Sequence, residues 1–470
     1  FEHVLNYYLA DSSERSKIKR PLITGNMDGA VNLAVLNTYL AEKRAGQMTG
    51  NVKFDLQVSG SPVNLSDLKP HGYMSITGGT LKDTLLPEPI QNLSAIFTVV
   101  ADTFKVDSMN VQFVSSDVSM KGRVVRPVPY FLTYLGVTEG DPPKPLFELN
   151  VKSQRFDVDK MFPEAVPGSE AATEQAMSTT EPSMVIPDMN GTGTFSIDTL
   201  IYSQIEFTGI NGNFRVQDRK MDCYDVSGAA YAGKVSGKTS IDLNDFASPK
   251  YTGEFKATDV EADEFIKRFS KFGGFLFGKI DLNGNYNASG WNRNEFVSSL
   301  TMDGLLQMNK GKLVTSGPSY QAMKAIASSL SLQFDQEQAI RSLSTKLAVK
   351  NGKVGLDNLN TSLGAVGDIE IGGFYDFNGG LDYKGSVLLS QDYTKKVMSF
   401  LTKGDVLGGI GGLFTDKSAE RMRLPLLIEG TVDDPKVKVD MGSLGKTAGE
   451  NLKNKLGNFL LDQFKKDEKK

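Results

Sequence analysis

Two short stretches carry residue types that could do chemistry, and each lacks a part that the chemistry needs. Asp281, Asn283 and Asn285 follow the spacing that opens a calcium-binding loop, but no acidic residue closes the loop at the required position. The glycine-rich segment 408–412 invites comparison with a phosphate-binding loop, but it lacks the Gly-Lys-Ser/Thr ending. We therefore predict outward-facing polar strand positions for the first stretch and a flexible hinge for the second.

Nucleophiles and metal ligands are scarce in this sequence. Cys223 is the single cysteine, and His3 and His71 are the two histidines among 470 residues. One cysteine excludes a disulfide within the chain, and two distant histidines argue against a histidine-rich metal site. No acid–base pair, nucleophile set or metal cluster emerges, so we predict that the protein is not an enzyme and has no cofactor and no metal.

Length and charge limit the class of protein. A chain of 470 residues is either several domains or one repeat array. The net charge of −4 implies no basic surface, so nucleic acid is not an expected partner. No run approaches the roughly 18 apolar residues that a membrane span needs. The chain begins with Phe1, and we expect a signal sequence or membrane anchor to precede it.

The elements that would position any site are short strands, and they repeat. In the segment 340–377, apolar and polar residues alternate and Asn351-Gly352 interrupts the alternation, which is typical of antiparallel strands joined by tight turns. A shift of 250 positions matches this segment to an earlier one, through the pairs Leu343 and Leu93, Leu356 and Val106, Leu359 and Met109, and Gly372 and Gly122. A looser copy lies between them, at Met221, Tyr224 and Gly237. We therefore predict that one β-meander is repeated three times along the chain.

Each copy is predicted to begin with a short helix, a hook, before its amphipathic strand. Apolar residues at helical spacing predict hooks at 31–43, 156–162 and 260–272, with a partial copy at 387–401. Four regions follow from this pattern. They are an N-terminal β-repeat region at 1–162, a mobile Pro/Ser/Glu-rich loop at 163–187, a C-terminal β-repeat region at 188–442, and an amphipathic helix with a charged tail at 443–470.

The expected fold class is mainly β, an elongated repeat of antiparallel β-meanders that forms a long curved sheet. A sheet with one apolar face must cover that face by packing on a second sheet, by closing into a barrel, or by curling around something apolar as an open trough. Strict alternation places one set of apolar residues on the inner face. The candidates are Val52, Phe54, Leu56, Val58, Phe195, Ile197, Ile280, Leu282, Leu347, Val349, Ile369, Ile371, Leu426 and Ile428.

One motif near the C-terminus resembles a known family. Residues 424–440 read LPLLIEGTVDDPKVKVD, which is similar to the closing motif of the AsmA-like family of bacterial envelope proteins, related to bridge-like lipid-transfer proteins. That motif is an apolar strand ending in Gly-Thr, then a turn with proline and a second strand with lysine. The resemblance is strongest over residues 255–441.

The resemblance implies an open trough and a non-enzymatic role. AsmA-like proteins are associated with moving phospholipid between the inner and outer membranes or with outer-membrane assembly. The expected partners are therefore phospholipid or another envelope lipid, and the two membranes or their proteins. The expected location is the periplasm, with an anchor in the inner membrane. The alternative is a structural scaffold of the envelope that binds proteins and no lipid.

Overall fold

The chain folds as a mainly β protein, as the alternating pattern predicts. The computed structural model describes residues 19–37, 47–61, 67–82, 88–134, 141–163, 188–269, 276–314, 337–364, 366–377, 379–402, 421–431 and 435–440, with short pieces at 7, 9–10, 12–15, 274 and 415–416. Contacts divide it into two compact units. Unit 1 comprises Phe1–Gly228, Gly237–Tyr251 and Ser289–Phe296, and unit 2 comprises Ala229–Ser236, Thr252–Ala288 and Val297–Lys470.

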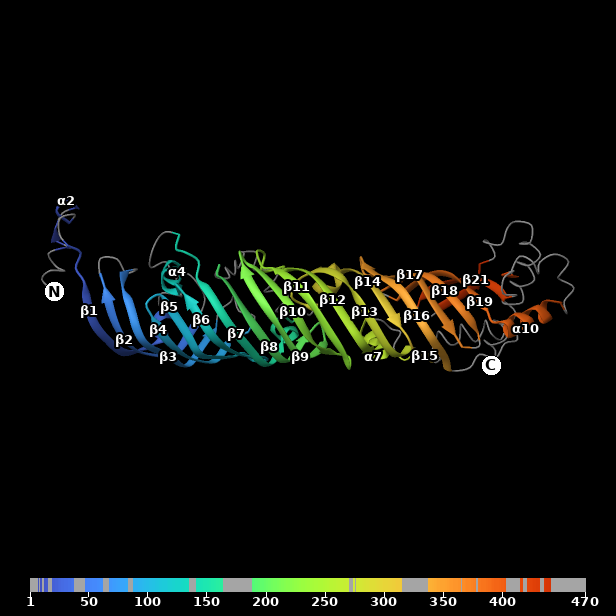
Figure 1. The fold of residues 1–470 in the computed structure, drawn as a ribbon, viewed down its shortest axis with the longest axis horizontal. Coiled ribbons are helices and arrows are strands. Elements are labelled where there is room, and N and C mark those ends of the chain that lie inside the picture. Colours follow the sequence, from blue (N-terminus) through green and yellow to red (C-terminus); the bar gives the residue numbers. More distant parts are fainter. Residues whose placement is uncertain are drawn as a thin grey trace. The chain divides into compact units, whose positions relative to one another are not determined.

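In unit 1, each strand of the sheet pairs with the next strand in the chain (Figure 1). Short turns join most of these strands, which favours antiparallel neighbours. The strands are β1 (Ile23–Asn32), β2 (Gln47–Gly60), β3 (Lys69–Lys82), β4 (Ile90–Val100), β5 (Thr103–Gln112), β6 (Asp117–Val125), β7 (Leu146–Asp157), β8 (Asn190–Tyr202) and β9 (Ile205–Gln217). The sequence pattern missed β1, because glycine and polar residues dominate it.

One pairing in unit 1 is parallel rather than antiparallel. β7 and β8 run in the same direction, from the pair Leu146 and Asn190 to the pair Asp157 and Ile201. A parallel pair needs a crossover of a dozen or more residues, and the chain from 158 to 189 supplies it. Residues 164–187 of the loop predicted at 163–187 lie outside the described residues, but both flanks of this loop belong to unit 1. The boundary between the units falls later, among residues 228–297.

Unit 2 holds the strands that lead to the motif at residues 424–440. The strands β10 (Lys220–Ala230), β11 (Gly233–Asp242), β12 (Lys250–Glu261) and β13 (Leu276–Ser289) lie where the chain passes between the units. The later strands are β14 (Thr301–Met308), β15 (Gly311–Val314), β16 (Glu337–Lys350), β17 (Lys353–Leu363), β18 (Gly367–Asp376), β19 (Gly380–Leu389), β20 (Thr415–Asp416), β21 (Arg421–Thr431) and β22 (Pro435–Val439). All of the later pairings are antiparallel.

Short helices occur at the positions of three predicted hooks, and the fourth differs. α5 (Val158–Met161), α7 (Ala262–Phe269) and α10 (Gln391–Thr402) each follow the end of a strand. The helix predicted from residue 31 is wrong at its start, because β1 continues to Asn32. The Asn32 side chain accepts a hydrogen bond from the Ala34 amide at 2.9 Å and opens a short 3-10 helix, η1 (Leu33–Leu36).

The remaining described helices are α2 (Ser12–Arg15), α4 (Pro127–Tyr134) and α8 (Arg293–Ser299). None of the helices in the described part of the chain is long and apolar enough to cross a membrane. The predicted C-terminal helix at 443–464 and the tail lie outside the described residues. Among the described residues, strand therefore greatly exceeds helix, and every helix except α2 follows the end of a strand.

A packed core forms in unit 2 around the α7 hook. Ala262 at the start of α7 is fully buried, and Phe265 and Ile266 pack onto the same cluster. The cluster also contains Ile280, which is 1% exposed. The Tyr231 ring meets Phe265 edge-on, with 5.9 Å between the ring centroids. This end of the sheet in unit 2 is therefore closed by protein side chains.

The structure supports the 250-residue repeat through matching irregularities. The β5–β6 pairing shifts register between Val106 and Met109, and the β17–β18 pairing shifts between Leu356 and Leu359. Both pairs were matched by the sequence repeat. β-Bulges of this kind bend a strand and are typical of curved sheets.

Candidate functional site

The strand register of unit 1 sorts its side chains onto two faces. Residues directly opposite each other in neighbouring strands point to the same face. Three neighbouring rows can therefore be followed from β1 to β9, and every position in them is apolar or glycine. We call these rows the apolar face of unit 1.

The first row is Val31, Val52, Ile76, Ala95, Met109, Met120, Val151, Phe195 and Gly212. The second is Gly29, Phe54, Met74, Phe97, Val106, Gly122, Leu149, Gly193 and Phe214. The third is Met27, Leu56, Gly72, Val99, Phe104, Val124, Phe147, Gly191 and Val216. No polar side chain interrupts any of them.

The opposite face of the same strands is polar. One of its rows is Asp28, Asp55, Tyr73, Thr98, Lys105, Arg123, Glu148, Thr192 and Arg215. Two neighbours in this row, Arg123 and Glu148, form an ion pair at 2.7 Å. Both partners are more than half exposed, so the pair contributes little to stability. The polar face is the one that water solvates.

The apolar face of unit 1 is only partly buried. Most of its side chains are half-buried, and only a few, such as Val99 and Val106, are buried. On the edge strand β1, Met27 is 48% exposed and Val31 is 41% exposed. An ordinary protein core buries such side chains almost completely. The described residues of unit 1 therefore leave apolar surface that another apolar group could cover.

Unit 2 also separates an apolar face from a polar one. Two of its rows are Tyr286, Met302, Val349, Val354, Tyr375, Leu381, Gly430 and Pro435, and Gly284, Gly304, Leu347, Leu356, Gly373, Tyr383, Ile428 and Val437. Burial raises the pKa of the Tyr383 hydroxyl above its ordinary range. The motif in β21 and β22 completes these rows, so it extends the same apolar face.

The fourteen predicted inner-face residues fall into two groups. Ten are half-buried on the apolar faces, namely Val52, Phe54, Leu56, Val58, Phe195, Ile197, Ile369, Ile371, Leu426 and Ile428. The other four are buried in unit 2, namely Ile280, Leu282, Leu347 and Val349, and none is more than 7% exposed. Apolar surface that remains partly accessible therefore lies mainly at the ten half-buried residues.

Sequence reasoning missed a set of glycines on the apolar face of unit 1. The Phe195 ring lies over Gly212, where a Cβ atom would meet the ring at 2.6 Å. The Phe214 ring lies over Gly193 in the same way, at 2.5 Å, and the Phe147 ring over Gly191 at 2.5 Å. The available signal is a glycine on one strand directly opposite a phenylalanine on the next. That signal can be recognised only when the strand register is known.

The structure describes some of the residues considered for chemistry. Asn283 and Asn285 are exposed on β13, as predicted for outer strand positions, and segment 408–412 lies outside the described residues. Burial raises the pKa of the Cys223 thiol to about 11, so it is protonated at neutral pH. Among the described side chains, no group of three or more could hold a metal ion.

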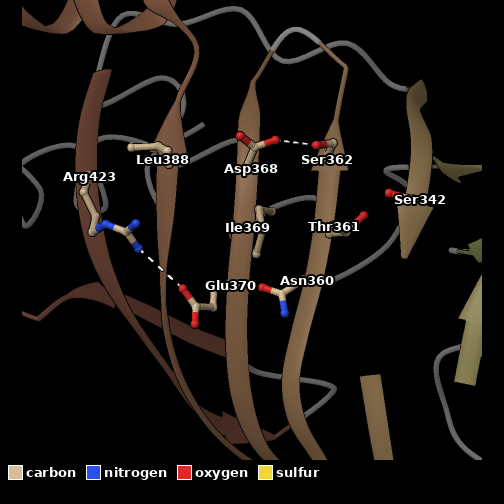
Figure 2. Close-up of a pocket in the computed structure, with 9 residues that line it drawn as sticks. All are labelled: Ser342, Asn360, Thr361, Ser362, Asp368, Ile369, Glu370, Leu388 and Arg423. Carbon is tan, nitrogen blue, oxygen red and sulfur yellow. Dashed lines mark hydrogen bonds and ion pairs between the residues drawn. The ribbon is translucent and has the colours of Figure 1, made fainter. Parts of the chain in front are cut away.

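A pocket of about 270 Å³ lies on the polar face of unit 2, over β16 to β21 (Figure 2). Asp368 accepts a hydrogen bond from Ser362, and Arg423 lies 3.5 Å from Glu370. Asp368 also pairs with Arg421 at 2.7 Å, while the same guanidinium donates to the Leu388 and Leu389 carbonyls. The charges at this pocket already have partners within the sheet.

We expect Asp368 to make unit 2 sensitive to acid. The Ser362 hydrogen bond and the Arg421 guanidinium lower the pKa of Asp368 below its ordinary value of 3.8. Its stabilising contribution is present above that value and is lost as the pH falls through the lower pKa of the folded state. Asp368→Asn should therefore lower the melting temperature at pH 7 but not at pH 2.

The acid test has a matched control nearby. The carboxylate is 47% exposed, so the effect at pH 7 should be at most about 1 kcal/mol. Glu370→Gln removes a charge from the more exposed pair with Arg423 and should change the melting temperature less. An equal loss for Asp368→Asn at both pH values would show that shape, not charge, matters at this position.

Comparison of the chain with protein-family models, with curated proteins and with solved structures finds no match. A functional proposal therefore rests on the geometry of the apolar faces, and in addition on the motif in β21 and β22.

Proposed function

We propose that the protein binds envelope phospholipid along its apolar sheet faces and transfers it without catalysing a reaction. The observation that supports this most directly is the set of three rows in unit 1, which cross the sheet from β1 to β9 without a polar side chain. Acyl chains need apolar contact and no hydrogen bonds, which is what this face offers.

The dimensions of the face in unit 1 suit acyl chains. Its eight pairings, at about 4.8 Å each, give a length of about 38 Å. A bilayer core is about 30 Å thick, so the acyl chains of one leaflet extend about 15 Å. The three rows are spaced two residues apart along each strand, so together they are about 14 Å wide. An extended chain could therefore lie across several strands.

A protein partner would suit this face less well. Protein interfaces combine an apolar centre with hydrogen bonds and a polar rim. The three rows offer no side-chain donor or acceptor over their whole length. This difference favours lipid over the scaffold alternative.

The resemblance of residues 424–440 to the AsmA-like family supports the same proposal. It suggests a periplasmic protein anchored to the inner membrane that supports outer-membrane biogenesis. The proposed partners are phospholipid or another envelope lipid, and the inner and outer membranes or their proteins, with no nucleic acid. The net charge of −4 does not favour a nucleic-acid partner.

Two neighbouring residues on opposite faces of β2 test the proposal. Leu56 is half-buried on the apolar face, and Gln57 is exposed on the polar face. Leu56→Asp places a charge among acyl chains, which is strongly unfavourable, so bound lipid should fall at least about tenfold. Gln57→Asp should leave bound lipid unchanged.

The measurement uses the full chain and vesicles of phosphatidylethanolamine and phosphatidylglycerol that contain a fluorescent phospholipid. Both variants are first shown to melt as the original protein does, within a few degrees. Lipid captured by the protein is then quantified after the vesicles are removed. Failure of the unaltered protein to capture lipid, or equal capture by both variants, would overturn the proposal and favour the scaffold role.

A further inference from the structure

Three phenylalanine rings in unit 1 lie over glycines of their neighbouring strands. We define Phe147, Phe195 and Phe214 as the phenylalanine floor. The Phe214 centroid lies 6.2 Å from that of Phe147 and 6.5 Å from that of Phe195, so the rings are contiguous. All three belong to the rows of the apolar face.

Glycine permits this arrangement at each ring. Each phenylalanine is paired directly with a glycine on the adjacent strand, at Gly191, Gly212 and Gly193 respectively. Because glycine has no side chain, the ring can rest on the backbone instead of standing away from the sheet. A ring in this position raises the apolar surface above the strand backbone by one van der Waals contact distance, about 3.5–4 Å.

The position of a ring over a glycine has two consequences. The ring covers the glycine backbone, which stabilises the sheet, and this role alone would explain the pairing. It also fills the gap that the glycine leaves in its row, with the rings tilted by 32° between Phe147 and Phe214 and by 42° between Phe195 and Phe214. The rings therefore join rows that glycine would otherwise interrupt with exposed backbone.

We infer that the phenylalanine floor is the segment of unit 1 on which a lipid acyl chain rests, and that Gly212 determines its fit by leaving room for the Phe195 ring above the neighbouring strand. This inference depends on the proposed lipid function and identifies the part of the face that contacts the chain. The ligand contacts the half-buried Phe147 and Phe195 rings through straight, unbranched hydrocarbon, while Phe214, which is 9% exposed, packs against both of them. A ring that stands up projects across the rows and breaks that contact.

Gly212 offers the sharpest test, because there a new methyl group meets mainly the ring. A Cβ atom at Gly212 would lie 2.6 Å from the tip of Phe195 and 3.3 Å from the nearest backbone atom, the Val226 Cα. At Gly193 a Cβ atom would also meet the Leu149 carbonyl oxygen, at 2.2 Å. Backbone strain and movement of the ring could then not be told apart. Gly212→Ala should therefore lift the Phe195 ring while the sheet persists.

The test compares four proteins in the fluorescent phospholipid assay. Gly212→Ala should lower captured phospholipid about threefold to tenfold, the range of one aromatic contact. Gly212→Ala combined with Phe195→Leu removes the obstructing ring and should recover most of the loss. Gly25→Ala adds a methyl group to β1 with nothing within 4 Å and should have no effect.

The outcomes separate this inference from the proposed function. If the unaltered protein captures no phospholipid, the proposed function fails and this inference fails with it. If it captures phospholipid and Gly212→Ala captures as much, the function stands and the phenylalanine floor is only structural. A loss that the double variant does not recover, with unchanged melting, assigns the effect to Gly212 itself and overturns the role of the ring.

Discussion

Ile280→Asp is expected to unfold unit 2. Ile280 is 1% exposed and belongs to the cluster that holds Met308 and Ile340 beside the α7 hook. A carboxylate there would lose its hydration without gaining a partner, and such changes are among the most destabilising known, above about 4 kcal/mol. The same reasoning applies to Leu282, which is 4% exposed.

The matched control removes volume without adding charge. Ile280→Val deletes one methylene group and should cost about 0.5–1.5 kcal/mol. Urea unfolding followed by circular dichroism measures both changes. A folded Ile280→Asp protein with near-normal stability would mean that this side chain faces water, and the packed core around α7 would have to be reconsidered.

Gly373→Ala is expected to destabilise unit 2 strongly, while Gly372→Ala is not. Gly373 has φ of +149°, a conformation open almost only to glycine. A Cβ atom there would lie 2.1 Å from the Asp382 carbonyl oxygen, so the backbone would have to move. The conformational strain alone costs about 1–3 kcal/mol, and the steric overlap adds to it.

The adjacent glycine makes this a stringent comparison. A Cβ atom at Gly372 would lie 3.5 Å from the Leu356 carbonyl oxygen, an ordinary contact distance. Alanine there restricts the unfolded chain and should change stability by less than about 1 kcal/mol in either direction. Thermal melting of both variants gives the result, and equal effects at the two positions would contradict the assigned backbone conformation.

This pair of glycines also corrects the sequence repeat. The repeat matched Gly122 to Gly372, but the structural counterpart of Gly122 is Gly373. Gly122 pairs with Val106 and has φ of +147°, and Gly373 pairs with Leu356 and has φ of +149°. The bulges shift the register equally in the two copies, but the second copy has one more residue between Leu359 and Ile371 than the first has between Met109 and Met120. A fixed shift along the sequence cannot detect that insertion.

The candidate site could be predicted in part. Period-two alternation is a local property, so it correctly indicated that Phe54 and Leu56 share one face of β2 and that Gln57 lies on the other. It could not indicate that Phe195 lies over Gly212, because that contact depends on which strand is the neighbour and in which register.

The sequence by itself determined the mainly β class, the antiparallel meanders, the positions of α5, α7 and α10, and the separation of apolar from polar faces. Each of these follows from residues close together in the chain. Tertiary structure decided the parallel pairing of β7 with β8 and the closure around Ile280, whereas Leu56 stays half-buried. Both Ile280 and Leu56 alternate with polar neighbours, so their difference arises only from what packs against them.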